Sequence, residues 1–365
     1  MLEGRLWVLL YRGKNMKSSI GVEYRKLQVT GGSTYIVSLP KRWITENNLK
    51  PSDVVGIEHL SSGEIQISPK ENKNLRRSVD LDLAKYPRGA LYDYLIGIYV
   101  SGADHITIRD KTGVGSKERR IIRQFLRDTR GMEISLDEDN SITIVSLLNP
   151  NELPLQVSLN RMYLLVTSLV EDSYGVLSGE DVEELSDHED RERQIDARRL
   201  LVDRQVAMAL NSPHIERALG VDRYQAMQHA AMSHYLERMG DHAYRFAKLV
   251  FETSGEVSVS LDTLPMTSIP VWLSALRSVI RNTYSKEMSV LVEEKQRLKD
   301  QLLDLETHEE ELMSSKDGAR NVLVEFKISE TVRRLCGYSI DLTETLINMM
   351  MAERTSLMES NDEVF

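Results

Sequence analysis

The spacing of apolar and polar positions divides the chain into three regimes. From residue 24 to residue 69, β-branched and aromatic residues form short runs interrupted by glycine and serine, a pattern typical of strands joined by tight turns. The runs predict two strands, a short helix opened by Pro40, and two further strands, in the order ββαββ. So small a unit buries little surface alone, and we expect it to oligomerise through its strands.

Residues 75–148 alternate between strand and helix patterns, and they predict a compact βαβαββ module. The segment Asp137–Ser141 is a hairpin signal between the last two strands. The asparagines and prolines of residues 149–154 are typical of a linker.

After Leu155 the apolar residues recur at the 3.6-residue period of helices. Residues 254–270 break this period with Gly255, Pro265 and Pro270, between two helical sets, so we expect a tandem pair of three-helix bundles. The predicted helical segments are 155–177, 180–210, 221–253, 271 to about 315, and 319 to about 351. The expected fold class is multidomain α+β, with a small β unit, a central α/β module and an all-α carboxy-terminal part.

Composition indicates the class of protein and its compartment. It has 365 residues, 41% of them apolar and 28% charged, as in ordinary globular proteins. A single cysteine, Cys336, forms no disulfide within the chain, and no apolar run approaches the roughly 18 residues that cross a bilayer. We therefore expect a cytoplasmic protein without membrane insertion. Residues 1–15 are expected to be an extension of uncertain status, and residues 355–365 a polar tail.

Charge is distributed unevenly along the chain. The net charge is -10, yet residues 1–77 hold 13 Lys and Arg against 7 Asp and Glu, a net of +6. A basic amino-terminal part favours polyanionic partners, and an acidic remainder favours cations. The overall acidity therefore does not exclude nucleic acid.

Two acid pairs are the sharpest chemical feature of the helical part. Glu192 and Asp196, and Glu237 and Asp241, are each four residues apart, so each pair shares one face of its helix. The apolar stripe of the third helix lies nearly opposite its pair, which predicts both acids at the bundle surface. If the two helices are neighbours, four carboxylates converge, and their repulsion is relieved by a cation. An all-oxygen set suits magnesium, manganese, calcium or iron.

An ordinary solvated acidic face is the alternative. At helical spacing Asp241 could pair with Arg245, and Asp196 with Arg199. His234 and His242 stand nearby and could extend a ligand set, although imidazoles on charged helices are usually solvated.

The segment 235–243 (YLERMGDHA), followed by Phe246-Ala-Lys, resembles the third-helix signature of PhoU proteins, which are phosphate-uptake regulators built from two three-helix bundles. The segment 190–196 (DRERQID) resembles the companion motif on their second helix. The resemblance, which covers about 155–350, implies a metal site with an iron or zinc cluster, or Mg or Mn. The ligands that it implies are Glu192, Asp196, Glu237 and Asp241.

The second repeat departs from that pattern. Arg333 stands where Glu237 stands in the first repeat, and Gly337 where Asp241 stands. Asp300 and Asp304 could be a remnant of the second-helix motif. We therefore expect no second metal cluster.

Residues 25–43 (RKLQVTGGSTYIVSLPKRW) and 49–55 (LKPSDVV) resemble the AbrB/SpoVT/MazE family, whose swapped-hairpin β-barrels dimerise and bind DNA. Ser52 departs from the glycine that the family often has. The resemblance implies a basic dimer surface that contacts phosphates. The alternative is that the unit only dimerises the protein and its cations are ordinary surface charge. The implied DNA contacts are Arg25, Lys26, Lys41 and Arg42.

Together these resemblances predict a homodimeric, DNA-binding regulator of phosphate uptake and phosphate homeostasis, not an enzyme, whose metal-binding helical domain is coupled to its DNA-binding domain. The alternative is an adaptor that does not bind DNA and docks on a phosphate-transporter ATPase or a sensor kinase. The predicted boundaries are 1–15 (extension), 22–70 (AbrB-like domain), 75–148 (α/β module), 155–255 (first PhoU-like repeat), 268–352 (second, degenerate PhoU-like repeat) and 355–365 (tail).

Overall fold

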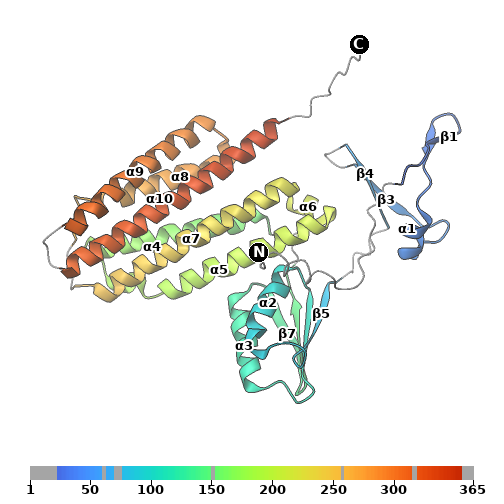
Figure 1. The fold of residues 1–365 in the computed structure, drawn as a ribbon, viewed down its shortest axis with the longest axis horizontal. Coiled ribbons are helices and arrows are strands. Elements are labelled where there is room, and N and C mark those ends of the chain that lie inside the picture. Colours follow the sequence, from blue (N-terminus) through green and yellow to red (C-terminus); the bar gives the residue numbers. More distant parts are fainter. Residues whose placement is uncertain are drawn as a thin grey trace, which may run out of the picture. The chain divides into compact units, whose positions relative to one another are not determined.

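The structure is a computed structural model that describes residues 23–59, 63–69, 76–148, 153–255, 259–314 and 319–355 (Figure 1). The expected extension at residues 1–15 lies outside the described residues, as does nearly all of the expected tail. The chain divides into two compact units, residues 1–75 and 76–365.

The first unit has the expected ββαββ order. Strand β1 (Gln28–Thr30) pairs with β2 (Thr34–Ile36), helix α1 (Lys41–Glu46) follows, and β3 (Val55–His59) pairs with β4 (Ile65–Pro69). Both pairs are antiparallel, and they form two separate two-stranded sheets. The described part of this single chain therefore contains two hairpins, and it does not close the swapped-hairpin barrel that the sequence led us to expect.

Apolar side chains of these hairpins lie in solvent. Val29 and Tyr35, which face each other across the first hairpin, are 60% and 70% exposed, and Ile57 on β3 is 64% exposed. An isolated two-stranded hairpin is marginally stable at best, and exposed apolar residues add to that cost. The unit thus lacks a buried core of its own in the described residues.

The central module is a four-stranded sheet in the order β5-β6-β8-β7. Strands β5 (Ser78–Asp82) and β6 (His105–Arg109) are parallel, and the other pairings are antiparallel. Helices α2 (Leu91–Val100) and α3 (Ser116–Asp128) lie on one side of the sheet (Figure 1). Strands β7 (Met132–Asp137) and β8 (Ser141–Ser146) form the expected hairpin. Alternate residues of the strands, such as Ile106 and Ile144, are fully buried beneath the helices.

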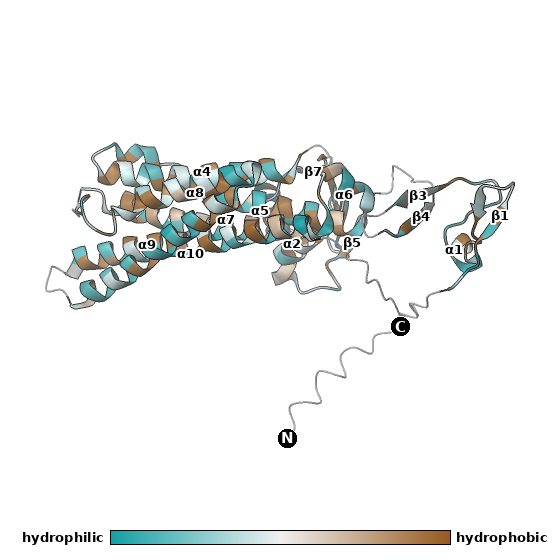
Figure 2. Cartoon of the chain, turned by 90° about the horizontal axis from the view of Figure 1, so that it is seen from above, coloured by the Kyte–Doolittle hydropathy of each residue, from teal (hydrophilic) through white to brown (hydrophobic). Residues whose placement is uncertain are grey.

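The helical part contains two sets of three long helices around one continuous core. The first set is α4 (Leu155–Leu177), α5 (His188–Asn211) and α7 (Arg223–Thr253), and the second is α8 (Ser268–Ser285), α9 (Met288–Ser314) and α10 (Ala319–Arg354). Helix α7 packs against α10, so the apolar stripes of both sets, visible as brown bands in Figure 2, meet in a single cluster. Trp272, fully buried, hydrogen-bonds through its Nε1 to the hydroxyl of Ser339 at 2.9 Å.

Three details differ from the sequence prediction. Helix α5 begins at His188 rather than at residue 180, because Asp181 accepts a hydrogen bond from the Glu183 backbone N–H and starts a separate short turn. A helix that the sequence did not predict, α6 (Pro213–Leu219), follows α5 and ends at Gly220 in the left-handed region. Lys286, whose backbone is also in the left-handed region, ends α8 and separates it from α9.

Helix α5 joins the helical part to the module. Leu200 of α5 belongs to the apolar core of the module. Arg204, only 3% exposed, donates a 2.7 Å hydrogen bond to the Tyr99 carbonyl and lies 3.4 Å from Asp104, and its guanidinium sits 5.0 Å from the Tyr99 ring centre. A buried cation with these partners holds the two parts together. Across the described residues, no helix is both long and apolar enough for a membrane span.

The contacts of Arg204 predict how its substitution changes the free energy of unfolding. Arg204→Ala removes the hydrogen bond, the ion pair and the contact with Tyr99, and it should lower the free energy of unfolding by about 2 to 4 kcal/mol. Arg193→Ala, an exposed change on the same helix, should alter it by less than about 0.5 kcal/mol. Urea unfolding followed by circular dichroism measures both, and equal effects of the two variants would contradict the anchoring role.

Candidate metal site

The site begins with an unusually close approach of α5 and α7. Gly240 of α7 faces the buried Ile195 of α5, and a Cβ atom added at Gly240 would lie 2.9 Å from Ile195 Cδ1 and 3.0 Å from its Cγ2. Only glycine permits this contact without displacing a neighbour. The next residue on each helix is an aspartate, Asp196 on α5 and Asp241 on α7, so the close contact brings the two carboxylates near each other.

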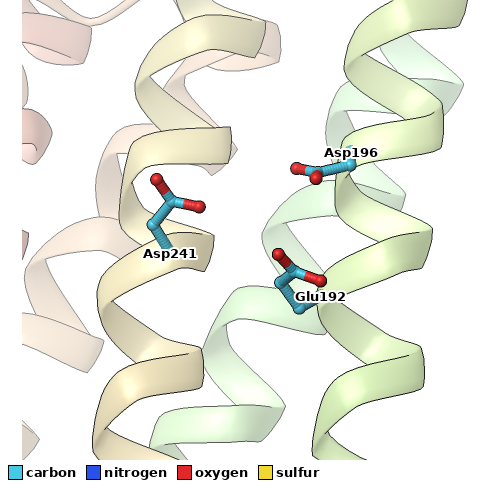
Figure 3. Close-up of side chains that lie close together, drawn as sticks. All are labelled: Glu192, Asp196 and Asp241. Atoms are coloured by element: carbon cyan, nitrogen blue, oxygen red, sulfur yellow. The ribbon is translucent and has the colours of Figure 1, made fainter. Parts of the chain in front are cut away.

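Three of the four predicted ligands converge. Glu192, Asp196 and Asp241 each offer a carboxylate oxygen, and these oxygens all lie within 4.8 Å of one another. Figure 3 shows Glu192 and Asp196 pointing from α5 toward Asp241 on α7. Within the described residues this is the one group of acids, histidines or cysteines close enough to share a metal ion.

The fourth predicted ligand, Glu237, is held by arginines instead. Its Oε1 lies 3.8 Å from Arg199 Nε and its Oε2 lies 3.5 Å from Arg238 Nε. Oε2 is buried and accepts no hydrogen bond in the structure. A buried carboxylate oxygen without a hydrogen-bond donor is costly, and a cation nearby would relieve that cost.

The acids are less exposed than the sequence predicts. Their position opposite the apolar stripe of α7 led us to expect Glu237 and Asp241 at the surface, but their side chains are only 13% and 24% exposed. The expectation was wrong because α7 is covered on two sides, by its own bundle core and by α5. The cluster is therefore half-buried between α5 and α7 rather than on an open face.

Burial and mutual repulsion raise the pKa values of Glu192, Asp196 and Glu237. Burial, followed by the charges of Glu192, Glu237 and Asp241, raises the pKa of Asp196 to about 7, against the opposing effect of Arg199. Burial and the Asp241 carboxylate raise the pKa of Glu192. Burial and Asp241 likewise raise the pKa of Glu237. Without a cation, Asp196 therefore remains partly protonated near neutral pH.

The central module contributes a further negative charge near the acids of α5. The Tyr92 hydroxyl on α2 donates a 2.8 Å hydrogen bond to Asp128 Oδ2 at the end of α3. The charge of Asp128 contributes to the raised pKa of Glu192, after burial and the nearer acids. Two elements of the module thus lie close to the acids on α5, a proximity that the sequence did not indicate.

The ion pairs that the sequence suggested for a solvated acidic face are replaced by others. Asp241 pairs with Arg238 at 3.1 Å, and Arg199 pairs with Asp203 at 2.7 Å. His234 lies 3.3 Å from Asp203, and His242 packs against the Tyr338 ring, so neither belongs to the group of three. One arginine therefore touches Asp241, and the carboxylates outnumber the cations that approach them.

Comparison with known proteins assigns this part of the chain. Residues 159–250, which contain the whole cluster, match the family model of the PhoU domain. This stretch is therefore similar to PhoU domains. Residues 28–74 match a second model, that of MazE, a bacterial antitoxin described as an antidote-toxin recognition protein. A search of curated proteins finds no match to the chain.

Solved PhoU structures resemble the chain at low identity. The phosphate transport system regulatory protein PhoU from Streptococcus pneumoniae is 19% identical, with 56% of this chain and 96% of that protein covered and a TM-score of 0.42. PhoU from Pseudomonas aeruginosa is 15% identical, with 54% and 96% covered and a TM-score of 0.45.

The second helical set replaces the acids of the PhoU domain with an internal ion pair. Arg333 of α10 donates from Nε to both oxygens of Glu309 on α9, at 2.9 Å and 3.1 Å. Glu309 is buried, and Ser329 hydrogen-bonds to it as well. The suggested remnant is not a site, because Asp300 and Asp304 are exposed and bond to neighbouring glutamines.

The predicted DNA-contacting residues are all exposed in the first unit. Arg42 pairs with Glu46 at 2.7 Å, and Arg25 pairs with Glu23. Lys26 and Lys41 have no ion-pair partner in the part of the chain that the structure describes. Lys41 begins α1, and its carbonyl accepts the Thr45 hydroxyl. The arrangement leaves two of the four cations uncompensated.

The raised pKa of Asp196 predicts a pH-dependent stability. Because the folded protein binds this proton more tightly than the unfolded chain, whose ordinary value is 3.8, the free energy of unfolding falls as the pH rises from about 4 through about 7. Asp196→Asn abolishes this loss. In EDTA at pH 8 the variant should be more stable than wild type by about 1 to 2 kcal/mol, since water reaches the carboxylate and reduces the roughly 4 kcal/mol that such a shift implies.

Urea unfolding at several pH values between 4 and 8 measures this difference. The control is Asp300→Asn, which removes an exposed acid from α9 and should show no pH-dependent gain. A gain for Asp196→Asn that does not change with pH would contradict the assignment.

The contact at Gly240 gives a second prediction. Gly240→Ala should lower the free energy of unfolding by about 1 to 3 kcal/mol, because the added methyl overlaps Ile195. Ile195→Val removes the nearer methyl, so the double variant should lose less than the sum of the two single changes. Gly337→Ala is the matched control: this glycine in α10 faces open space, and alanine there should stabilise by about 0.5 to 1 kcal/mol. Additive losses in the double variant would count against the close contact.

Proposed function

We propose that the protein is a DNA-binding regulator of phosphate uptake and phosphate homeostasis, in which a metal-binding PhoU-like domain is coupled to a dimeric AbrB-like domain. The observation that carries the proposal is the convergence of Glu192, Asp196 and Asp241 inside the stretch that matches the PhoU domain. The description of the similar Streptococcus pneumoniae protein as a phosphate transport system regulator supports the process.

The carboxylates suit a hard or borderline cation. Glu192, Asp196 and Asp241 would hold the ion through oxygen, and Glu237 would join them if it left Arg199 and Arg238. Oxygen donors suit magnesium, manganese or iron, whereas a zinc site usually includes nitrogen or sulfur. The ion would supply positive charge that neutralises the repulsion among these acids. Burial and like charge raise the pKa values of Glu192, Asp196 and Glu237, and a bound cation would relieve that repulsion.

Dimerisation through the first unit is supported by its uncovered apolar residues. Val29, Tyr35 and Ile57 lie in solvent in one chain, and pairing of the hairpins of two chains would bury them. A two-fold arrangement would double the cations Lys26 and Lys41. The match to the MazE model covers Lys41 and Arg42 but begins after Lys26.

Helix α5 provides a physical route for coupling. Its amino-terminal half carries Glu192 and Asp196, and Leu200 and Arg204 follow one and two turns later at the contact with the central module. Relief of charge repulsion between α5 and α7 would change how α5 is held. The module would sense that change through the buried Arg204 and through Asp128 beside Glu192.

Calorimetric titration of the full-length protein with Mn²⁺ tests the metal site. Wild type should bind the ion, and Asp196→Asn/Asp241→Asn should lose affinity at least tenfold. Asp300→Asn/Asp304→Asn removes the same charge from exposed positions on α9 and should bind like wild type. Absence of uptake of Mn²⁺, Mg²⁺, Zn²⁺ and iron by wild type would refute the metal site.

Genome-wide DNA occupancy tests the regulatory function. Wild type should occupy promoters of phosphate-uptake genes, with occupancy that differs between high and low phosphate, and Lys41→Ala/Arg42→Ala should lose it. Unchanged phosphate-uptake genes and transport in a deletion strain would reject the function. Capture of a transporter ATPase or sensor kinase together with no DNA occupancy would favour the adaptor role.

A further inference from the structure

Helix α3 of the central module has a strongly basic outer face. The stretch from residue 116 to residue 130 holds six Lys and Arg against two acids, a net of +4 in a chain whose net charge is -10. At about 100° per residue, four of the cations and one glutamine fall within an arc of about 120°, opposite the buried Ile122 and Phe125. These residues are Lys117, Arg120, Arg123, Gln124 and Arg127, and all are exposed.

The cations on this face are uncompensated. Arg119, at its edge, is bound by Asp137 and by two carbonyl groups, and Glu118 is buried. By contrast, Lys117, Arg120, Arg123 and Arg127 make no hydrogen bond or ion pair to any residue that the structure describes. Exposed arginines on helices commonly pair with an acid three or four residues away, and this face has no acid at those positions. Its charge is therefore available to a partner.

Further cations gather just beyond the end of α3. Arg130 follows the helix, and the Nε atoms of Arg130 and of Arg198 on α5 are buried without a hydrogen-bond partner. Burial, followed by the charges of Arg130 and Arg161, lowers the pKa of Arg198. Three guanidinium groups therefore repel one another where the module meets the helical part. An anion there would relieve both the repulsion and the unsatisfied donors.

The chemistry of the face selects among polyanions. A membrane-surface helix carries large apolar residues beside its cations, yet none of the exposed large apolar side chains in the described residues belongs to α3. Single-stranded nucleic acid requires aromatic side chains on which bases stack, and the exposed face has none. Protein interfaces have apolar centres, which this face also lacks. Interfaces with duplex DNA are the polar and strongly positive class.

The dimensions of the face also fit a duplex. Lys117 and Arg127 are ten residues apart, so the row spans about 15 Å along the helix. A strand of B-DNA carries one phosphate per 3.4 Å of axis, about four over that length, which matches the four cations. Phosphate contacts made by such a row would position the protein on the duplex and carry no sequence information.

We infer that the outer face of α3, formed by Lys117, Arg120, Arg123 and Arg127, is a second DNA-contacting surface that binds the phosphate backbone of duplex DNA without sequence preference. The inference rests on the proposed DNA-binding function, and it assigns a role to the central module that neither family match covers. The module then adds affinity to whatever sequence the amino-terminal unit selects.

The test measures binding of the full-length protein to a fluorescent 24-base-pair duplex of random sequence across a range of salt concentrations. Arg120→Ala/Arg123→Ala/Arg127→Ala should bind at least tenfold more weakly at 50 mM salt. The slope of log affinity against log salt should fall by about 0.9 for each phosphate that the variant no longer neutralises. The matched control, Arg281→Ala/Lys299→Ala/Lys327→Ala, removes three exposed cations from the helical part and changes the net charge equally, so it should bind like wild type.

A parallel arm with Lys41→Ala/Arg42→Ala separates the two proposals. Loss of binding in that variant, with wild-type affinity and slope in the α3 variant, would overturn this inference and leave the proposed function standing. The reverse result would support the α3 face and count against DNA contact by the amino-terminal unit. Equal weakening of the α3 variant and its matched control would overturn the inference as a general charge effect. So would binding of phosphatidylserine vesicles that requires the α3 cations while duplex binding does not.

Discussion

The close packing of α5 against α7 is the constraint on which the candidate site depends. Gly240 has no side chain, so Ile195 packs directly on the backbone of α7, and the aspartates that follow each of these residues are forced together. The apolar contact therefore sets the distance between the charges. Core packing, which is stiff, holds like charges closer than they would settle on their own.

Helix α5 carries three kinds of contact in sequence along its length. Glu192 and Asp196 face α7, Leu200 enters the core of the module, and Arg204 binds the carbonyl of Tyr99. Because a helix is rigid over such distances, a change in the forces at one of these positions is felt at the others. Displacement of this one helix would be enough to couple the acids to the central module.

Much of the architecture follows from local patterns. The 3.6-residue period located the long helices, and the alternation of strands and helices gave the βαβαββ order of the central module. Spacing alone also put the two acids of each pair on one face. The environment of those acids was less predictable, because it depends on neighbours that are distant in sequence. Glu237 is bound by Arg199 of another helix, and Asp128 approaches Glu192 from the module.

Two other features leave signals in the sequence. The glycine directly before Asp241 indicates a close helix contact, and the cations of α3 recur every three or four residues on a single face. By contrast, the described hairpins of the first unit form two separate sheets, and the expected barrel would need a second chain to close it. No pattern within one sequence specifies where a second chain would lie against these hairpins.

The ion pair between Arg333 and Glu309 has a consequence for how the two helical sets differ. In the second set a guanidinium, tethered covalently to α10, occupies the role that a diffusible cation would have in the first. This guanidinium is part of the chain, so it is present beside Glu309 whatever ions the solution contains. Glu309 is therefore neutralised by a group of the protein itself, on the helix that packs against α7. A cation bound by Glu192, Asp196 and Asp241 would then act on the α5 side of α7 alone, because the corresponding place in the second set already holds a fixed charge.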